Sequence, residues 1–199
     1  MARASLHRDA IVQTAARLFR KQGFAATGLN QIVEDSGAPK GSLYHYFPGG
    51  KEAIAAAAVT WASERVQLTL SKLAGEVDGP EDLVRRYALL LAGWMSKSGF
   101  RGGCPISTTL LETAPQSDLI REAGAAAFAA WAGIFSASLQ AAQVPPRRAD
   151  RLASMAIAVI EGALIQARVA VHQRALLDAA EEVATAFGSA ISEAARGET

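Results

Sequence analysis

The segment of residues 29–51 constrains the fold more than any other, because it has the pattern of two short helices joined by a tight turn. Leu29, Ile32 and Val33 are spaced to form one apolar helical face. Gly37 predicts the end of this first helix, since glycine readily adopts the left-handed conformation of a C-terminal cap. The segment therefore favours a compact helical unit.

A second short helix is predicted to begin at Pro39, whose fixed φ and missing N–H suit the first helical position. Its apolar residues, Leu43 and Phe47, can face inward, whereas polar side chains cover the rest: Lys40, Ser42, Tyr44 and His45. A short helix, a tight turn and a second helix with polar side chains that can contact DNA are typical of the DNA-binding helix-turn-helix.

The N-terminal region also resembles the DNA-binding domain of the TetR family of bacterial repressors. The resemblance rests on residues in family order and spacing: Ile11, Ala15, Leu18, Phe19, Gly23-Phe24, Thr27, Gly37, the run from Gly41 to Phe47, and Lys51-Glu52. The link of residues 47–51 is one residue longer than is usual in the family. Together with the later Gly102-Gly103-Cys104-Pro105, this form resembles the branch that contains the lincomycin-resistance repressor. Ala38-Pro39 departs from the family, which more often has a Ser or Thr cap there.

A helix-turn-helix places the N-terminal residues of its second helix nearest the bases. Lys40 and Ser42 are therefore predicted to contact bases or phosphates, and Gly41 lets the backbone approach the DNA. Tyr44 and His45 are better placed for phosphates, which fix register and carry no sequence information. The resemblance adds Thr27 and Lys51 as phosphate contacts. The alternatives are ordinary exposed lysines at 40 and 51 and a solvated His45. Tyr46 and Phe47 are predicted to be core residues and not DNA contacts, since so short a helix needs apolar anchors.

Composition predicts an all-α protein, because half of the 199 residues are apolar and no alternating strand pattern with hairpin turns is present. We expect a helix-turn-helix DNA-binding domain at residues 1–50 and a helical effector-binding and dimerisation domain at residues 51–199. Residues 1–51 carry seven cations and three anions, whereas the whole chain has a net charge of only +1. A basic head on a mildly acidic body suits phosphate binding at one end.

A soluble, cytoplasmic protein without a membrane partner is predicted. The single cysteine excludes an intramolecular disulfide and fits a reducing compartment, and early charges interrupt any apolar signal core at the N-terminus. Residues 123–146 lack charge over a length that could span a bilayer. Their alanine, glycine and glutamine content favours a buried helix instead.

The body is predicted to be helical, with a first long helix over residues 51–73 and breaks at residues 75–80, 98–105, 115 and 145–146. Aromatic stripes padded with Ala and Gly predict a pocket for an apolar or aromatic effector. The predicted lining is Trp61, Trp94, Met95, Phe100, Cys104, Phe128, Trp131 and Phe135. A well-filled core is the alternative interpretation of the same spacing. Cys104 is expected to pack beside the pocket, with redox sensing as the less favoured hypothesis.

The last two helices each carry an apolar stripe with small residues suited to close packing. The resemblance implies that they pair with their copies in a twofold four-helix bundle, through Leu152, Met155, Val159, Ala163, Val183, Phe187 and Ile191. The alternative is that both stripes are used inside one subunit. A twofold dimer predicts a palindromic double-stranded operator.

The function expected from the sequence is that of a repressor, a homodimer on its DNA operator that a small effector releases. The three histidines are far apart, and no phosphate loop, nucleophile elbow or metal-ligand spacing occurs, so neither catalysis nor a metal or cofactor is expected. A helical interaction module would leave the polar run at residues 40–45 unexplained. A small-molecule-binding or redox-sensing protein without effector-released repression is the remaining alternative.

Overall fold

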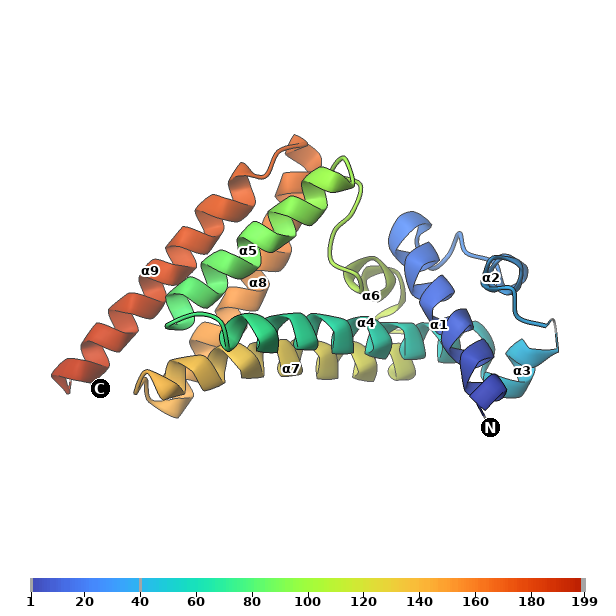
Figure 1. Cartoon of the computed structure of the whole chain (residues 1–199), viewed down its shortest axis with the longest axis horizontal. Helices are drawn as coiled ribbons and strands as arrows, with labels where there is room; N and C mark the ends of the chain where they lie inside the picture. Colours follow the sequence, from blue (N-terminus) through green and yellow to red (C-terminus); the bar gives the residue numbers. More distant parts are fainter. Residues whose placement is uncertain (1, 40, 198–199) are drawn as a thin grey trace. The chain divides into compact units, whose positions relative to one another are not determined.

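The computed structural model describes residues 2–39 and 41–197, which form nine α-helices and no strand (Figure 1). The all-α prediction is confirmed. The helices are α1 (Ala2–Gln22), α2 (Leu29–Ser36), α3 (Ser42–Tyr46), α4 (Gly50–Ala74), α5 (Pro80–Lys97), α6 (Ser107–Thr113), α7 (Asp118–Ala141), α8 (Pro146–Ala170) and α9 (Arg174–Arg196).

The chain divides into two compact units. The first comprises residues 1–65 and 104–127, and the second comprises residues 66–103 and 128–199. Helices α4 and α7 each contribute residues to both units. The division predicted at residue 50 separates a DNA-binding segment from the rest by function, and it remains a prediction.

The first unit is organised around α1, which packs against α2, α3 and α6 (Figure 1). Apolar side chains at helical spacing on α1 meet those of α2, α3 and the start of α4 in one core. Its fully or almost fully buried members are Ile11, Leu18, Phe19, Ile32, Leu43, Phe47 and Ile54. An ion pair between Arg17 and Asp35, 2.9 Å apart, also joins α1 to α2. The short α3 is therefore held by its apolar side, and its polar side remains available.

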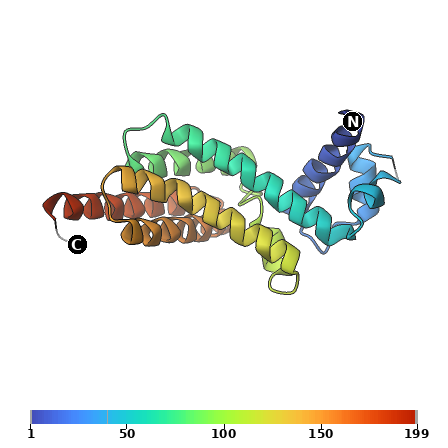
Figure 2. The same ribbon diagram turned by 90° about the horizontal axis from the view of Figure 1, so that it is seen from below.

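The second unit is built on α5, α8 and α9, which lie side by side (Figures 1 and 2). Phe135 of α7 is completely buried, with its ring centroid 6.3 Å from the rings of both Tyr87 and Phe187. At the surface, Nε of Arg85 lies 2.9 Å from a carboxylate oxygen of Glu181, joining α5 to α9. Aromatic packing and close helix contact thus form the core of this unit.

Local signals place most helix ends correctly. Gly37 follows α2 with φ +65° and donates its N–H to the carbonyl of Glu34, as its predicted role as a cap requires. Helix α5 begins at Pro80, with Glu81 and Asp82 in its first turn. The prediction for Pro39 was wrong: α3 begins at Ser42, and the Pro39 carbonyl accepts the N–H of Ser42 in a turn before the helix.

One helix, α8, is long and apolar enough to cross a membrane by length and composition alone, and 44% of its most apolar window is buried inside the protein. Its buried side is the one that packs on α5 and α9. A core helix of a soluble protein has the same composition, so this property agrees with a buried role for α8.

Val171, which follows α8, has a left-handed backbone with φ +51° and ψ +36°, and its side chain is 64% exposed. A β-branched residue is strained in this conformation. We expect Val171→Gly to raise the free energy of unfolding by about 0.5–1 kcal/mol, since glycine removes the strain at some entropic cost. Urea denaturation measures the change. Val169→Gly, on the same surface but inside α8, is the matched control and is expected to give no gain; equal effects at both positions would contradict the assignment of strain.

Candidate DNA-binding surface

The outward face of α3 is the surface predicted to read DNA. Leu43 is buried and Phe47, just after the helix, is only 3% exposed, so both anchor α3 in the core of the first unit. Gly41 and His45 are exposed, Tyr44 is 66% exposed, and Ser42 is half-buried. The predicted contacts in this run thus lie at or near the surface, and the core role weighed for Phe47 agrees with its burial.

Aromatic side chains and a cation gather at the end of α3. The rings of His45 and Tyr46 are 5.0 Å apart in an edge-to-face arrangement. The guanidinium of Arg8 lies 5.5 Å from the ring centroid of Phe47 and brings a cation from α1 close to the end of α3. The exposed hydroxyl of Tyr44 and the imidazole of His45 can donate hydrogen bonds to phosphate oxygens.

Thr27 lies just before α2, as the resemblance predicted, but its side chain faces inward. Its side chain is fully buried, and its hydroxyl donates to the carbonyl of Gly23 at 2.7 Å. The hydroxyl closes the loop between α1 and α2 from inside, and a contact of Thr27 with phosphate stays a prediction. Lys40, the predicted base contact, lies outside the described residues.

Lys51 is half-buried in the first turn of α4, against the loop between α1 and α2. Its ammonium lies 3.4 Å from the carbonyl oxygen of Ala25 and 4.3 Å from the ring centroid of Phe24. Partial burial lowers the pKa of Lys51, and the nearby carboxylate of Glu112 acts in the opposite direction. The side chain is thus held in place by its neighbours while it contributes a cation beside the N-terminus of a long helix, where anions are favoured.

The carboxylate that organises this loop is not among the residues predicted from the sequence. Glu112 of α6 accepts the backbone N–H of Phe24 at 3.1 Å and that of Ala25 at 2.6 Å. These N–H groups lie beyond the end of α1 and are not part of its helical hydrogen bonds, so Glu112 supplies their acceptor. No local pattern marks Glu112, because its partners lie 87 and 88 residues earlier in the chain.

A second polar contact joins the start of α4 to the turn before α7. The hydroxyl of Ser117, 7% exposed, donates to the carboxylate of Glu52 at 2.9 Å. Glu52 immediately follows Lys51, so the backbone that presents Lys51 is fixed from two sides. Inside the first unit, hydrogen bonds therefore join the loop between α1 and α2 to α6, and the start of α4 to the residue before α7.

The residues predicted to bind an effector differ in burial and in the unit to which they belong, and their role in effector binding stays a prediction. Met95, Trp131 and Phe135 are buried core residues, whereas Trp94 is 46% exposed. Phe128 packs edge-to-face on Trp131 at 5.5 Å and borders a shallow groove with Ile157. The remaining three are Trp61 and Cys104, which belong to the first unit, and Phe100, which is half-buried in the second.

The predicted dimer residues also separate into two sets. Those buried within the subunit's own core are Leu152, Ala163, Val183 and Phe187. Met155 is 38% exposed, and Val159 and Ile191 are half-buried. The exposed side of α8 carries further apolar side chains that the prediction did not include, Ile165 and Val169. Contacts with a second copy are therefore open only to the outer members of the predicted set.

Cys104 is 7% exposed, which limits the access that a redox sensor requires. Within residues 2–39 and 41–197, no three or more His, Cys, Asp or Glu side chains are grouped so as to hold a metal ion.

Comparisons with known proteins match two separate parts of the sequence. Residues 11–58 match the family described as bacterial regulatory proteins, tetR family. Residues 80–182 match the C-terminal domain described as transcriptional regulator, LmrA/YxaF-like. The two matches cover the helix-turn-helix and most of the helical body.

Individual relatives agree with these matches. The HTH-type transcriptional regulator YxaF of Bacillus subtilis (strain 168) is 34% identical over 176 residues, covering 88% of this chain and 92% of YxaF. LmrA, an HTH-type transcriptional regulator of the same strain, is 34% identical over 170 residues, covering 85% of this chain and 90% of LmrA. A crystal structure of a TetR transcriptional regulator from Chloroflexus aurantiacus J-10-FL has a TM-score of 0.77 at 29% identity, covering 93% of this chain and 96% of that one.

The resemblance inferred from the sequence is thereby confirmed, and relatives of this kind are regulators of transcription, not enzymes. The chain belongs to the TetR family of bacterial transcriptional regulators, in the group with an LmrA/YxaF-like C-terminal domain.

Proposed function

We propose that the protein is a ligand-responsive repressor that binds a palindromic operator as a homodimer and is released by a small apolar or aromatic effector. The observation that carries the proposal is the exposed, polar face of α3, whose opposite apolar face is buried, together with the cation that Lys51 holds at the start of α4. A regulator of transcription works on the chromosome, so we place it in the bacterial cytoplasm.

Charge supports DNA as the partner. The excess of four cations in residues 1–51 lies in the segment that holds α1, α2 and α3. Cations that neutralise phosphates release counterions, so affinity falls steeply with salt concentration. A helical module that binds only small molecules would lack this dependence.

Dimerisation is supported by the outer face of α8. Met155, Val159, Ile165 and Val169 recur at helical spacing, and none of them is buried in the subunit. A second copy related by a twofold axis would cover these side chains. The DNA-binding domains of the two copies would then bind half-sites about one turn of the DNA helix, 34–36 Å, apart.

An effector site in the body is supported by Phe128. It borders a mainly apolar groove of about 380 Å³ between α7 and α8, and the size is within the range of small-molecule sites. Release requires that the effector favour a conformation that does not bind DNA. To change the ratio of the DNA-binding to the released conformation from 99:1 to 1:99, the effector must bind the released conformation more favourably by roughly 5.5 kcal/mol. Helix α4, which contributes residues to both units, is suited to transmit such a change.

The decisive experiment is selection of bound fragments from random and genomic DNA with the purified protein. Enrichment of a palindrome with half-sites one turn apart supports the dimeric operator. Absence of both an enriched site and salt-sensitive duplex binding would refute the proposal.

Replacing α3 side chains separates positioning from base recognition. We expect Tyr44→Ala to weaken binding to operator and random duplex by a similar factor, because a phosphate contact carries no sequence information. Lys40→Ala is expected to weaken binding to the operator more than binding to a random-sequence duplex. The two losses of binding free energy should differ by about 1–3 kcal/mol. Fluorescence anisotropy on both duplexes measures the two ratios.

Tyr44→Phe is the matched control, because it removes only the hydroxyl from an exposed ring. It reproduces the loss if the hydroxyl binds phosphate. A Lys40→Ala variant that loses equal affinity on both duplexes would remove Lys40 from base recognition.

A further inference from the structure

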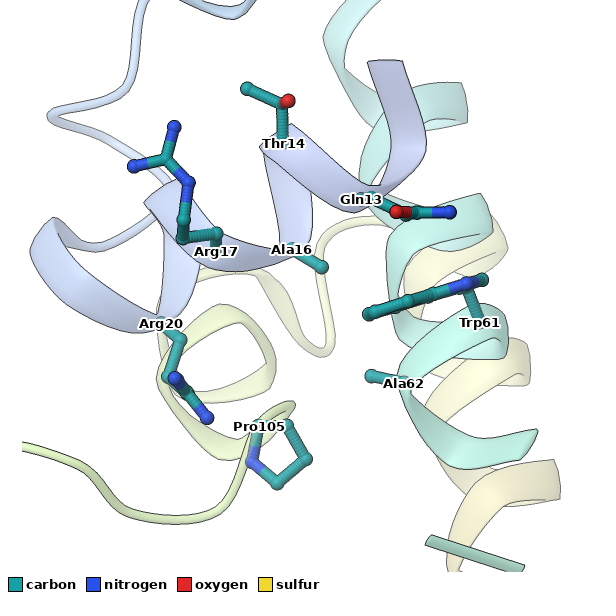
Figure 3. A pocket seen from close by; sticks show the side chains of 8 residues that line it. All are labelled: Gln13, Thr14, Ala16, Arg17, Arg20, Trp61, Ala62 and Pro105. Carbon is teal, nitrogen blue, oxygen red and sulfur yellow. The ribbon is translucent and has the colours of Figure 1, made fainter. Parts of the chain in front are cut away.

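A cleft in the first unit lies apart from the outward face of α3. It has a volume of about 450 Å³ and is lined by α1, by α4 and by Pro105, which precedes α6 (Figure 3). A volume of this size accommodates a ligand of one or two rings. None of its lining residues belongs to α2 or α3, so it is separate from the proposed DNA contacts.

The inner part of the cleft is apolar. Ala16 is 8% exposed and Ala62 is 3% exposed, and both present only a methyl group. The half-buried Trp61 extends its indole into the cleft from α4 (Figure 3). The guanidinium of Arg65 lies 5.3 Å from the Trp61 ring, which orients the indole and adds positive charge beside it. These groups suit a planar aromatic ring.

The rim is cationic. Arg17 and Arg20 both line the cleft, and none of the lining residues that the structure describes carries a carboxylate. The charge of Arg17 is offset by its ion pair with Asp35, and its side chain is directed away from Trp61 (Figure 3). Arg20 extends toward Pro105 and has no hydrogen bond or ion pair with any residue that the structure describes. The amide of Gln13, beside Trp61, likewise makes no such bond with described residues.

We propose that this cleft binds a small aromatic carboxylate. The ring lies against Trp61, Ala16 and Ala62, and the carboxylate pairs with the guanidinium of Arg20, which offers two parallel N–H donors. Gln13 supplies an additional donor at the opposite edge. The ligand would bridge α1 and the first half of α4, both of which belong to the first unit.

The charge of Arg20 also has a structural explanation that the test must separate from ligand binding. Arg20 lies in the last turn of α1, where a cation stabilises the helix through its dipole. That role needs no ligand, so the measured quantity has to be affinity for a probe. The inference is independent of the proposed repressor function, because binding is measured on the protein without DNA.

The test is isothermal titration calorimetry of the full chain with naphthalene carboxylate. Two matched probes are the neutral naphthalene carboxamide and the saturated decahydronaphthalene carboxylate. We expect the aromatic acid to bind about tenfold more tightly than either, because only it combines a planar ring with a negative charge. Equal affinity for all three, or no saturable binding of the acid, overturns the proposal.

Variants then locate the site. Arg20→Gln and Trp61→Leu are each expected to reduce affinity for the acid about tenfold, and Arg20→Lys is expected to retain part of it. Lys21→Gln removes the neighbouring cation of α1, which does not line the cleft, and should leave affinity unchanged. Circular dichroism melting curves verify that each variant is folded. Unchanged affinity in both Arg20→Gln and Trp61→Leu would place the bound acid elsewhere and overturn the proposal, whatever the result of the DNA selection.

Discussion

Replacing Gly23 with alanine is expected to lower the free energy of unfolding by about 2–3 kcal/mol, through backbone strain and the loss of a carboxylate contact. Gly23 follows α1 with φ +90°, a conformation that costs an L-residue about 1–2 kcal/mol. A Cβ atom there would also overlap the carboxylate of Glu112. Glu112 would have to move, and the N–H groups of Phe24 and Ala25 would lose their acceptor. Urea denaturation of the purified variant measures the loss.

A double-mutant cycle with Glu112→Ala separates the two causes. Once the carboxylate is absent, Gly23→Ala is expected to cost only the backbone strain, about 1–2 kcal/mol. Additive effects of the two changes would show that the overlap has no energetic consequence. Operator affinity should also fall in Gly23→Ala, because the displaced loop carries the contacts of Lys51.

Replacing Phe135 with alanine is expected to cost about 3–5 kcal/mol of folding free energy, because it leaves a cavity in the centre of the second unit. The Phe135 ring is completely buried between Tyr87 and Phe187. Because protein cores are close-packed, the surrounding side chains cannot move enough to fill the space of a missing ring. Thermal and urea unfolding of the variant measure the effect.

Trp94→Ala is the matched control, since the sequence predicts the same pocket role for both aromatics. Trp94 is 46% exposed, so its removal is expected to cost less than about 1 kcal/mol. Losses of similar size at the two positions would contradict the division of these aromatics into core and surface groups.

The sequence specified the local structure well, because helix ends depend on neighbouring residues. The left-handed cap at Gly37 and the start of α5 at Pro80 follow from the backbone preferences of glycine and proline. The spacing of Leu29 and Ile32 predicted α2, and Ile32 is completely buried. Pro39 was the exception, because proline also suits a turn, and periodicity in a helix of five residues is too short to locate its start.

The sequence could not separate residues of one chemical class by their role. Phe135 and Trp94 share the spacing and chemistry of a pocket lining, yet one is buried and the other exposed. Leu152 and Val183 have the same stripe pattern as Met155 and are buried inside the subunit. Helical periodicity shows that a face is apolar, but the neighbouring helix decides what covers it.

By itself, the sequence determined the all-α class, the helix-turn-helix and the TetR family, because these depend on ordered local motifs. Only the tertiary structure decided that Thr27 closes a loop from inside, that Glu112 holds that loop, and that Arg20 and Trp61 border one cleft. The contact of Glu112 with the loop and the cleft beside Arg20 and Trp61 each bring together residues that lie at least 41 positions apart in the sequence. Such contacts form because apolar packing of whole helices brings distant segments together, and no short-range pattern in the chain records them.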